Sequence, residues 1–491
     1  MRERRRRYVV LPRQGVLSST IGASLAAMQG SGGGLDDLLG GPAQGAPDAR
    51  GSMLKSSLLE QSGAMAAAQD SASSGEDVFA RAIQPGRAPA NLAMVELAAQ
   101  IAETDFTAIS QKFADGPALV DLTATARLAF EAINPELRIV PVTTYALPGM
   151  KPRKAKGTAA RAAAVIAGSV TRPAQIDGQT WNTDFKQHVL EGIAGGNLGA
   201  GVTVAVIDSG VDGTHAALDG AVAVSRCLIA GAEPTAGRPV DWGAARATRA
   251  AHGTHVAGII AARPGHGGPA GVAPAASIAS YRIFPDHPDK EKGADNIDVI
   301  NSIISAVQDQ CHVINLSIEG SRLREDGVRS AITAAWNQGV VCIAAAGNGF
   351  GAPVSYPAAH QNCIAVTALG RAGSYPADPD FLRFESRERS AVDADVYLAS
   401  FSNFGPQVQF AAAGHAIVST FPDDQWWFDS GTSMASPFVA GVLARLLSNA
   451  PEVRDRFGDA DRSAAMLQLL ISRANALRLP QRAQEGYGLP S

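Results

Sequence analysis

Three polar residues that could together perform nucleophilic catalysis lie far apart in the sequence. Asp208 ends the apolar run VTVAVID, His252 lies in HGTH, and Ser433 lies in GTSMASP. A serine hydroxyl becomes a nucleophile when a histidine accepts its proton and a carboxylate holds the imidazole in the required tautomer. These residue types therefore allow acyl transfer, provided that the fold brings the three side chains together.

Each of these residues also has a more ordinary explanation when it is taken singly. A carboxylate after a strand often caps the next turn, and a hydroxyl before an apolar helix is most often an N-cap. His252 and His255 could be metal ligands, but the glutamate of a His-Glu-x-x-His zinc site is missing. The small neighbours of Ser433 favour catalysis, because they leave its oxygen approachable and let the first helix amides face a developing oxyanion.

Asn348 is a fourth candidate and closes the segment AAAGN. Its side-chain amide can donate a hydrogen bond to the negatively charged oxygen of a tetrahedral intermediate. Asn348 therefore supplies the second donor that an oxyanion hole requires.

The elements that must position these residues are those of an α/β protein. Short, nearly continuous apolar runs, as expected for strands covered on both faces, lie at 202–208, 276–284, 311–318, 340–347 and 362–369. Helical patterns lie between them at 294–308 and 328–338. This alternation predicts a parallel sheet with right-handed crossovers, in which working residues gather at the carboxyl ends of the strands.

The N-terminal part of the chain has a different composition. Residues 1–90 are rich in Gly, Ala and Ser over most of their length and are predicted to be mostly flexible. Residues 91–150 are predicted to form a small α+β unit, with helix-spaced patterns at 92–103 and 119–133 and a β-branched segment at 137–145. Another strand could come from 8–11. A basic linker is expected at 151–178.

Composition and charge argue against several classes of function. Lys+Arg 42 against Asp+Glu 46 gives a formal net charge of −4, which disfavours an electrostatic nucleic-acid binder. No apolar run is long enough for a membrane span. The four cysteines are scattered and predict neither a zinc ribbon nor a disulfide framework.

The basic N-terminus, MRERRRR, bears on the compartment. It could begin a twin-arginine export signal, but Pro12, Arg13 and Gln14 interrupt the apolar segment that should follow. We therefore expect a cytoplasmic protein, with export as the alternative.

Taken together, the motifs resemble those of the subtilisin-like serine proteases. The three signatures VAVIDSGVD, HGTHVAG and GTSMASP occur in the required order, and the likeness extends over 179–491 through GVAP, INLS, SFSNFGP and GYGL. The resemblance implies a three-layer α/β peptidase domain that hydrolyses polypeptides through an acyl-enzyme. It makes Ser433 the nucleophile and His252 the general base, which Asp208 orients. Asn348, with the backbone N–H of Ser433, would bind the oxyanion.

The resemblance also implies that an extended substrate peptide binds by strand addition. The residues expected to bind it are Gly293, Ala294, Asp295, Ser317, Ile318, Glu319 and Gly320. From sequence alone these segments could equally be a plain loop and a strand edge. Glu319 stands where the family usually has glycine, and its carboxylate could favour Lys or Arg on the acyl side of the scissile bond. An exposed loop glutamate, paired with Arg322 or Arg324, is the default expectation.

Cofactor and partner expectations follow from the same resemblance. The loop RPGHGGPAG lacks the asparagine-containing turn that holds calcium in secreted family members, so no cofactor is expected, with calcium as the alternative. The family is commonly made with a small α+β propeptide that assists folding and then occupies the active-site cleft. Residues 91–150 have a suitable size for this role, and a permanent accessory domain is the alternative.

Other enzyme classes fit less well. An α/β-hydrolase would need the motif Gly-x-Ser-x-Gly and a serine that precedes its catalytic partners in the sequence. A dinucleotide-binding fold would need its glycines after the first strand, whereas GGNLGAG precedes the apolar run at 202–208. The alternative that stays open is a catalytically silent subtilisin-fold module that serves for binding or as a scaffold, because geometry and not residue identity defines a working triad.

Overall fold

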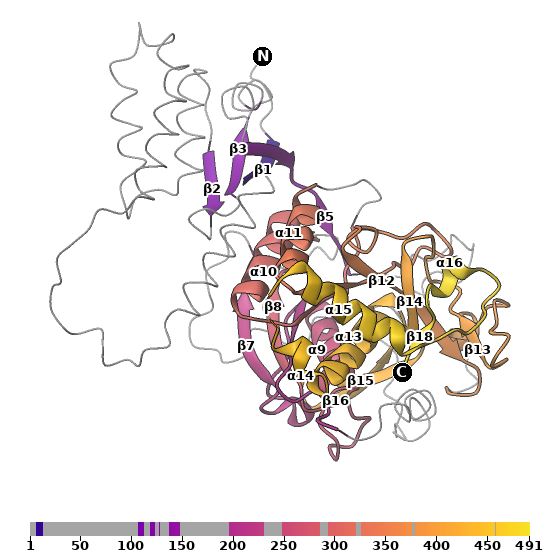
Figure 1. Ribbon diagram of the computed structural model, residues 1–491. Coiled ribbons are helices and arrows are strands. Elements are labelled where there is room, and N and C mark those ends of the chain that lie inside the picture. Colours follow the sequence, from indigo (N-terminus) through magenta and orange to yellow (C-terminus); the bar gives the residue numbers. More distant parts are fainter. Residues whose placement is uncertain are drawn as a thin grey trace, which may run out of the picture.

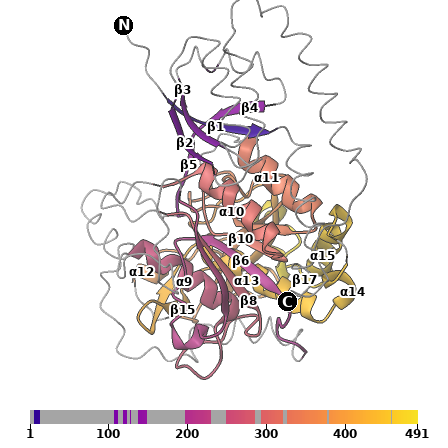
Figure 2. The same cartoon turned by 90° about the vertical axis from the view of Figure 1, so that its left-hand side faces the viewer.

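The computed structural model describes residues 6–12, 107–111, 118–122, 127, 137–147, 196–229, 248–284, 293–320, 326–375, 379–456 and 458–491. From Gly196 to the C-terminus these residues form an α/β domain with helices on both faces of a central sheet (Figure 1). A smaller sheet built from residues before 142 lies beside two of those helices in both views (Figure 2). The predicted three-layer α/β architecture is confirmed.

The central sheet contains the five strands that the sequence predicts. They are β6 (Thr203–Asp208), β8 (Ser277–Arg282), β10 (Val313–Leu316), β11 (Val341–Ala345) and β12 (Cys363–Arg371). The strand order is β13-β12-β11-β10-β6-β8-β7, with β14 (Val408–Ala413) paired to β12, β7 at Val222–Cys227 and β13 at Val396–Leu398. Every pairing is parallel except that of β12 with β13.

The apolar runs arise because the strands are buried on both faces. Successive side chains of a strand point to opposite sides of the sheet. In β6, Val204 and Val206 accordingly join one apolar core and Ala205 and Ile207 join the other. All four side chains are at most 1% exposed, so the strand is entirely apolar between Thr203 at its start and Asp208 at its end.

Each core is closed by a pair of helices. On one face, α9 (Thr248–Ala261) and α13 (Thr432–Ser448) pack on the sheet, with α15 (Ala460–Ser472) beside α13. On the other face lie α10 (Asn296–Gln308) and α11 (Asp326–Asn337), as the helical patterns at 294–308 and 328–338 predict. The shorter elements are η4 (Ala216–Leu218), β9 (Ala294–Asp295), α12 (Pro379–Leu382), β15 (Ile417–Phe421), β16 (Gln425–Asp429), α14 (Pro451–Arg454), β17 (Ala474–Asn475), α16 (Arg482–Glu485) and β18 (Leu489–Pro490).

The N-terminal sheet joins segments that are distant in the sequence. Its order is β2-β3-β1-β4, with β1 at Arg6–Pro12, β2 at Thr107–Gln111, β3 at Ala118–Leu122 and β4 at Leu137–Pro141, and all of its pairings are antiparallel. The strand anticipated at 8–11 is present as β1. The helix predicted at 119–133 is wrong at its start, where the chain is strand β3. The predicted helix at 92–103 and the linker at 151–178 lie outside the described residues.

The N-terminal sheet packs on the face of the domain that carries α10 and α11. Val9, Leu119 and Val140 belong to the same apolar core as those helices. Arg7 and Arg138 reach across to Asp295 and Asp326, at 3.3 and 2.7 Å. After β4 the chain continues into β5 (Thr144–Tyr145), which pairs with β9 of the large domain. Among the described residues, no helix combines the length and apolarity needed to cross a bilayer.

Candidate active site

Asp208 and His252 are brought together by the end of β6 and the first turns of α9. Nδ1 of His252 lies 2.9 Å from each carboxylate oxygen of Asp208. The carboxylate is fully buried and also accepts a hydrogen bond from the Ser209 N–H at 2.6 Å. Because Nδ1–H donates to Asp208, the Nε2 atom of His252 carries the lone pair that a general base needs.

The charge on Asp208 sets the basicity of His252. Burial of the imidazole disfavours its protonated form, but the charge of Asp208 and its hydrogen bond, with a smaller contribution from Asp429, outweigh this penalty. The pKa of His252 is consequently raised above its ordinary value of 6.5. The arrangement therefore stabilises the imidazolium that forms when His252 accepts a proton.

Gly253 allows α9 to approach β6 closely enough for this contact. A Cβ atom at this position would lie 2.3 Å from the carbonyl oxygen of Gly210 and 3.2 Å from Cβ of Asp208. The Gly253 N–H donates to Oγ of Ser209 at 2.9 Å, which fixes the helix start on the loop after β6. The glycine that follows His252 in the sequence is thus part of the geometry of the pair.

Ser433 lies in the first turn of α13 and is 1% exposed. Its Oγ makes no hydrogen bond within the part of the chain that the structure describes, so the hydrogen bond to His252 expected of a resting triad is not formed. Its carbonyl oxygen accepts from Oγ of Ser317 at 2.8 Å. This contact joins the predicted nucleophile to the predicted substrate-binding segment.

Asn348 is oriented by the residue before Ser433. Its Oδ1 accepts from both N–H and Oγ1 of Thr432, at 3.0 and 2.9 Å. A Cβ atom on Gly431 would lie 3.0 Å from Nδ2 of Asn348 and 3.6 Å from the backbone nitrogen of Ser433. The missing side chain of Gly431 therefore leaves a space that both predicted oxyanion donors border.

The two predicted substrate-binding segments flank a strand of the N-terminal region. Thr144 and Tyr145 pair antiparallel with β9 on one side. On the other side, the N–H of Ala146 donates to the carbonyl of Glu319 at 2.7 Å, and the N–H of Glu319 donates back at 2.8 Å. The segment 144–146 is therefore the central strand of a three-stranded arrangement.

Three of the seven predicted substrate-binding residues, Ala294, Asp295 and Glu319, pair through their backbone with this strand. Ala294 and Ile318 have fully buried side chains in the core beneath, and the Asp295 side chain belongs to the capping box of α10. Gly320 makes room for the buried Tyr145, whose ring would lie 2.6 Å from a Cβ there. A Cβ on Gly293 would likewise collide with the carbonyl oxygen of Tyr145.

Glu319 differs from the default expectation of an exposed loop glutamate. The residue is half-buried, and its Oε2 accepts a hydrogen bond from the N–H of Asn348 at 3.3 Å. A Cβ atom on Gly347 would lie 2.8 Å from the same oxygen. The carboxylate thus lies against the segment that carries the oxyanion donor, whereas Arg322 and Arg324 fall outside the described residues.

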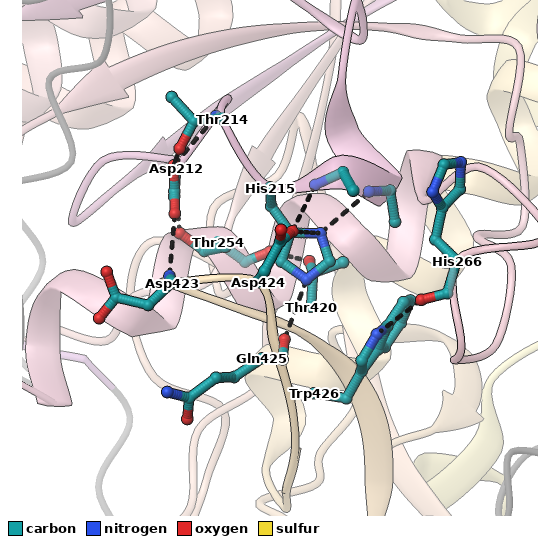
Figure 3. Close-up of polar contacts among 12 residues, drawn as sticks. Asp212, Thr214, His215, Thr254, His266, Thr420, Asp423, Asp424, Gln425 and Trp426 are labelled. Carbon is teal, nitrogen blue, oxygen red and sulfur yellow. Dashed lines mark hydrogen bonds and ion pairs between the residues drawn. The ribbon is translucent and has the colours of Figure 1, made fainter.

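The β15–β16 hairpin is a part of the site that sequence reasoning missed. Asp212 accepts hydrogen bonds from Thr214 and from the N–H of Asp423 at the hairpin tip, and His215 Nε2 lies 2.9 Å from the carbonyl of Gln425 (Figure 3). Trp426 donates to the carbonyl of His266, in the loop after α9, at 3.1 Å (Figure 3). The polar residues that follow β6 in VIDSGVDGTH, among them Asp212, are a sequence signal for this network.

The hairpin ends next to the predicted nucleophile. Thr420 of β15 donates to the carbonyl of Thr254 in α9 at 2.8 Å, which fixes the hairpin to the helix that bears His252. The last residue of the hairpin, Asp429, lies two positions before Gly431, the first residue of the GTSMASP motif, and contributes through its charge to the raised pKa of His252. Among the described residues, no group of three or more His, Cys, Asp or Glu is placed to hold a metal ion.

Comparison with known proteins gives consistent matches over the large domain. The model of the subtilase family, Peptidase_S8, matches residues 199–488. The chain is 36% identical over 275 residues to a thermophilic serine proteinase of Bacillus sp. (strain AK1), which covers 56% of this chain and 57% of the relative. It is 34% identical over 251 residues to thermitase of Thermoactinomyces vulgaris, covering 51% and 76%. Subtilisin E of Bacillus subtilis (strain 168) is 33% identical over 272 residues, covering 53% and 60%.

Proposed function

The chain belongs to the subtilase family, and from this premise we propose that it is a serine endopeptidase that hydrolyses polypeptides through an acyl-enzyme. The matched region spans 57% of the length of the first of these relatives, so the activity of the whole protein is a proposal. The observation that carries it is the contact of His252 with the buried Asp208 carboxylate at 2.9 Å.

The chemistry begins with proton transfer to His252. Its Nε2 takes the proton of Ser433 Oγ as that oxygen attacks the carbonyl carbon of the substrate. The tetrahedral intermediate collapses when the imidazolium gives the proton to the departing amine, which leaves an ester on Ser433. Water then attacks the ester with His252 again as base, and the released acid restores the enzyme.

The space beside Gly431 supports the oxyanion part of the proposal. The negative oxygen of the intermediate needs donors at about 2.7–3.1 Å, and Asn348 Nδ2 and the Ser433 N–H both border this space. Removal of one such donor typically lowers turnover by about 100–1000-fold. Asn348 is held for this purpose by its two hydrogen bonds with Thr432.

Active-site labelling tests the assignment of the nucleophile. A serine-reactive fluorophosphonate should form one adduct with the protein, and the adduct should disappear in Ser433→Ala. Ser436→Ala is the matched control, since Ser436 is a fully buried serine of the same helix whose hydroxyl lies 3.0 Å from that of Ser317. A silent binding module would give no adduct, and an adduct that persists in Ser433→Ala would refute the assignment.

The N-terminal region is proposed to act as an intramolecular inhibitor. Residues 144–146 lie between the two segments expected to bind substrate, and they use the backbone hydrogen bonds that a peptide would use there. Catalysis then requires cleavage of the chain after this strand and release of the sheet that precedes it. A permanent accessory domain is the alternative.

N-terminal sequencing of the active protein separates these two roles. Self-maturation predicts a new N-terminus within 145–180 and no cleavage in Ser433→Ala. A full-length chain that hydrolyses casein at the rate of the processed one would show that the region is an accessory domain.

A further inference from the structure

The strand pairing places the Glu319 side chain on a defined face of the strands that Ala146 and Glu319 join. Ala146 and Glu319 exchange both of their N–H···O bonds, so their side chains project to the same face of the strand pair. Tyr145 projects to the opposite face, where it is buried beside Gly320. A bound peptide that runs as residues 144–147 do would therefore place alternate side chains, those in register with Ala146, on the same face as Glu319.

The carboxylate of Glu319 extends along this face toward the reacting centre. Oε2 accepts from the N–H of Asn348 at 3.3 Å. The preceding residue, Gly347, donates its own N–H to Oγ1 of Thr432 at 3.1 Å, next to Ser433. The acidic group thus contacts the backbone of Asn348, the residue whose side chain is proposed to bind the oxyanion.

Gly347 makes this position available to the carboxylate. A Cβ atom on Gly347 would lie 2.4 Å from Nδ2 of Asn403, 2.6 Å from Oγ of Ser355 and 2.8 Å from Oε2 of Glu319, so a larger residue would crowd all three side chains. The backbone of Gly347 has φ +103°, a conformation that residues with a side chain rarely adopt. The backbone conformation and the position of the carboxylate therefore depend on the same residue.

We propose that Glu319 makes the cleft select Lys or Arg on the acyl side of the scissile bond, an inference that rests on the proposed endopeptidase function. A peptide chain that runs as residues 144–147 do presents, two residues beyond the partner of Glu319, a side chain on the same face. In this antiparallel register that position is opposite Ser317, whose hydroxyl donates to the carbonyl of Ser433 at 2.8 Å, so it lies closer to Ser433 than the partner of Glu319 does. A cationic side chain there meets a half-buried carboxylate, which attracts it more strongly than an exposed one would. Leu or Phe at that position would instead desolvate the carboxylate without replacing its hydrogen bonds to water.

The sequence of the chain supplies a substrate of this kind. Residues 151–156, KPRKAK, contain four basic residues and begin four positions after Leu147. A cleft selective for Lys or Arg would direct self-cleavage into this segment. Maturation and substrate choice would then depend on the same glutamate.

Peptides that differ at one position test the inference on the processed enzyme. Fluorogenic tetrapeptides that end in Lys, Arg, Leu, Phe or Ala before the leaving group should show kcat/KM for Lys and Arg at least about tenfold above Leu and Phe, a difference of about 1.4 kcal/mol. Glu319→Gln keeps the shape of the side chain and removes its charge, so the ratio should fall to about one. Asp461→Asn removes an equal charge from an exposed site on α15 and should leave the ratio unchanged.

The outcomes separate this inference from the proposed function. If the wild-type enzyme reacts with the fluorophosphonate but prefers Leu or Phe, the inference is wrong and the endopeptidase assignment stands. A preference for Ala alone would mean that Glu319 obstructs the pocket, which also overturns the inference. Absence of both labelling and hydrolysis would refute the proposed function itself, and a Lys/Arg preference that survives in Glu319→Gln would assign it to another residue.

Discussion

Gly431→Ala tests the oxyanion site with the smallest change that the chain allows. The added Cβ atom would lie 3.0 Å from Asn348 Nδ2 and 3.6 Å from the Ser433 nitrogen. An oxyanion must be about 2.7–3.1 Å from its donors, so the methyl group occupies the place where that oxygen would lie. The backbone at this residue has φ 169°, an extended conformation open to any residue, so no strain is added.

The expected loss of activity follows from this geometry. Loss of one oxyanion donor costs about 100–1000-fold in kcat, or about 2.7–4 kcal/mol, and the methyl group obstructs both. We expect kcat of Gly431→Ala to fall by about 1000-fold or more, whereas Tm changes by less than about 4 °C. The assay is hydrolysis of a fluorogenic peptide by the processed enzyme, with thermal unfolding measured on the same sample.

A double mutant shows whether the two residues act on the same oxygen. Asn348→Ala alone should cost about 100–1000-fold in kcat. Gly431→Ala already prevents the oxyanion from reaching Nδ2. The kcat of the double mutant should therefore lie within a few-fold of the kcat of Gly431→Ala. A Gly431→Ala enzyme within threefold of wild-type kcat, or strictly additive losses, would refute this description of the site.

Three further perturbations follow from described contacts. Because Asp208 raises the pKa of His252, a pH–rate profile of the wild type should show kcat/KM falling as the pH decreases, with a midpoint above 6.5. Asp208→Asn should lower that midpoint and reduce kcat by about 10⁴-fold. Gly253→Ala would place a Cβ 2.3 Å from the carbonyl oxygen of Gly210 and should destabilise the domain by about 2–3 kcal/mol in urea unfolding. An unchanged urea midpoint of unfolding would contradict the close packing of α9 on β6. Tyr145→Ala removes a ring that is 2% exposed, at a cost of about 3–5 kcal/mol, and should shorten the lag before the full-length chain becomes active. Arg138→Ala breaks only a partly exposed ion pair and should barely change that lag, and equal effects of the two variants would argue against docking through Tyr145.

The strands that end near the site were predictable because local pattern and tertiary environment agree. A strand covered on both faces needs an unbroken apolar run, so β6 could be recognised and the first polar residue after that run, Asp208, marked its end. The same logic placed Asn348 after β11. For these two positions, the residues immediately before them are enough to predict where the strand ends.

Elements whose partners are distant could not be predicted in the same way. Nothing near Arg6–Pro12 shows that this strand inserts between β3 and β4, more than a hundred residues later. The segment ALVDL is too short for its apolar pattern to separate a helix from a strand, and pairing with β1 decides in favour of the strand. Likewise, the Glu319 side chain is turned toward Asn348 by a contact with another strand end, which no local pattern contains.

The proposed inhibition by the strand at 144–146 would depend on protein concentration in a way that its covalent attachment determines. A segment on the same chain meets its site at an effective concentration on the order of millimolar, independent of how dilute the protein is. Even with a micromolar intrinsic affinity, the segment would occupy the cleft about a thousand times more often than it leaves it empty. Once the chain is cut, the segment competes only at the concentration of the protein itself. Dilution to nanomolar levels would then empty the cleft. Cleavage of one peptide bond thus changes inhibition that is independent of protein concentration into inhibition that dilution relieves.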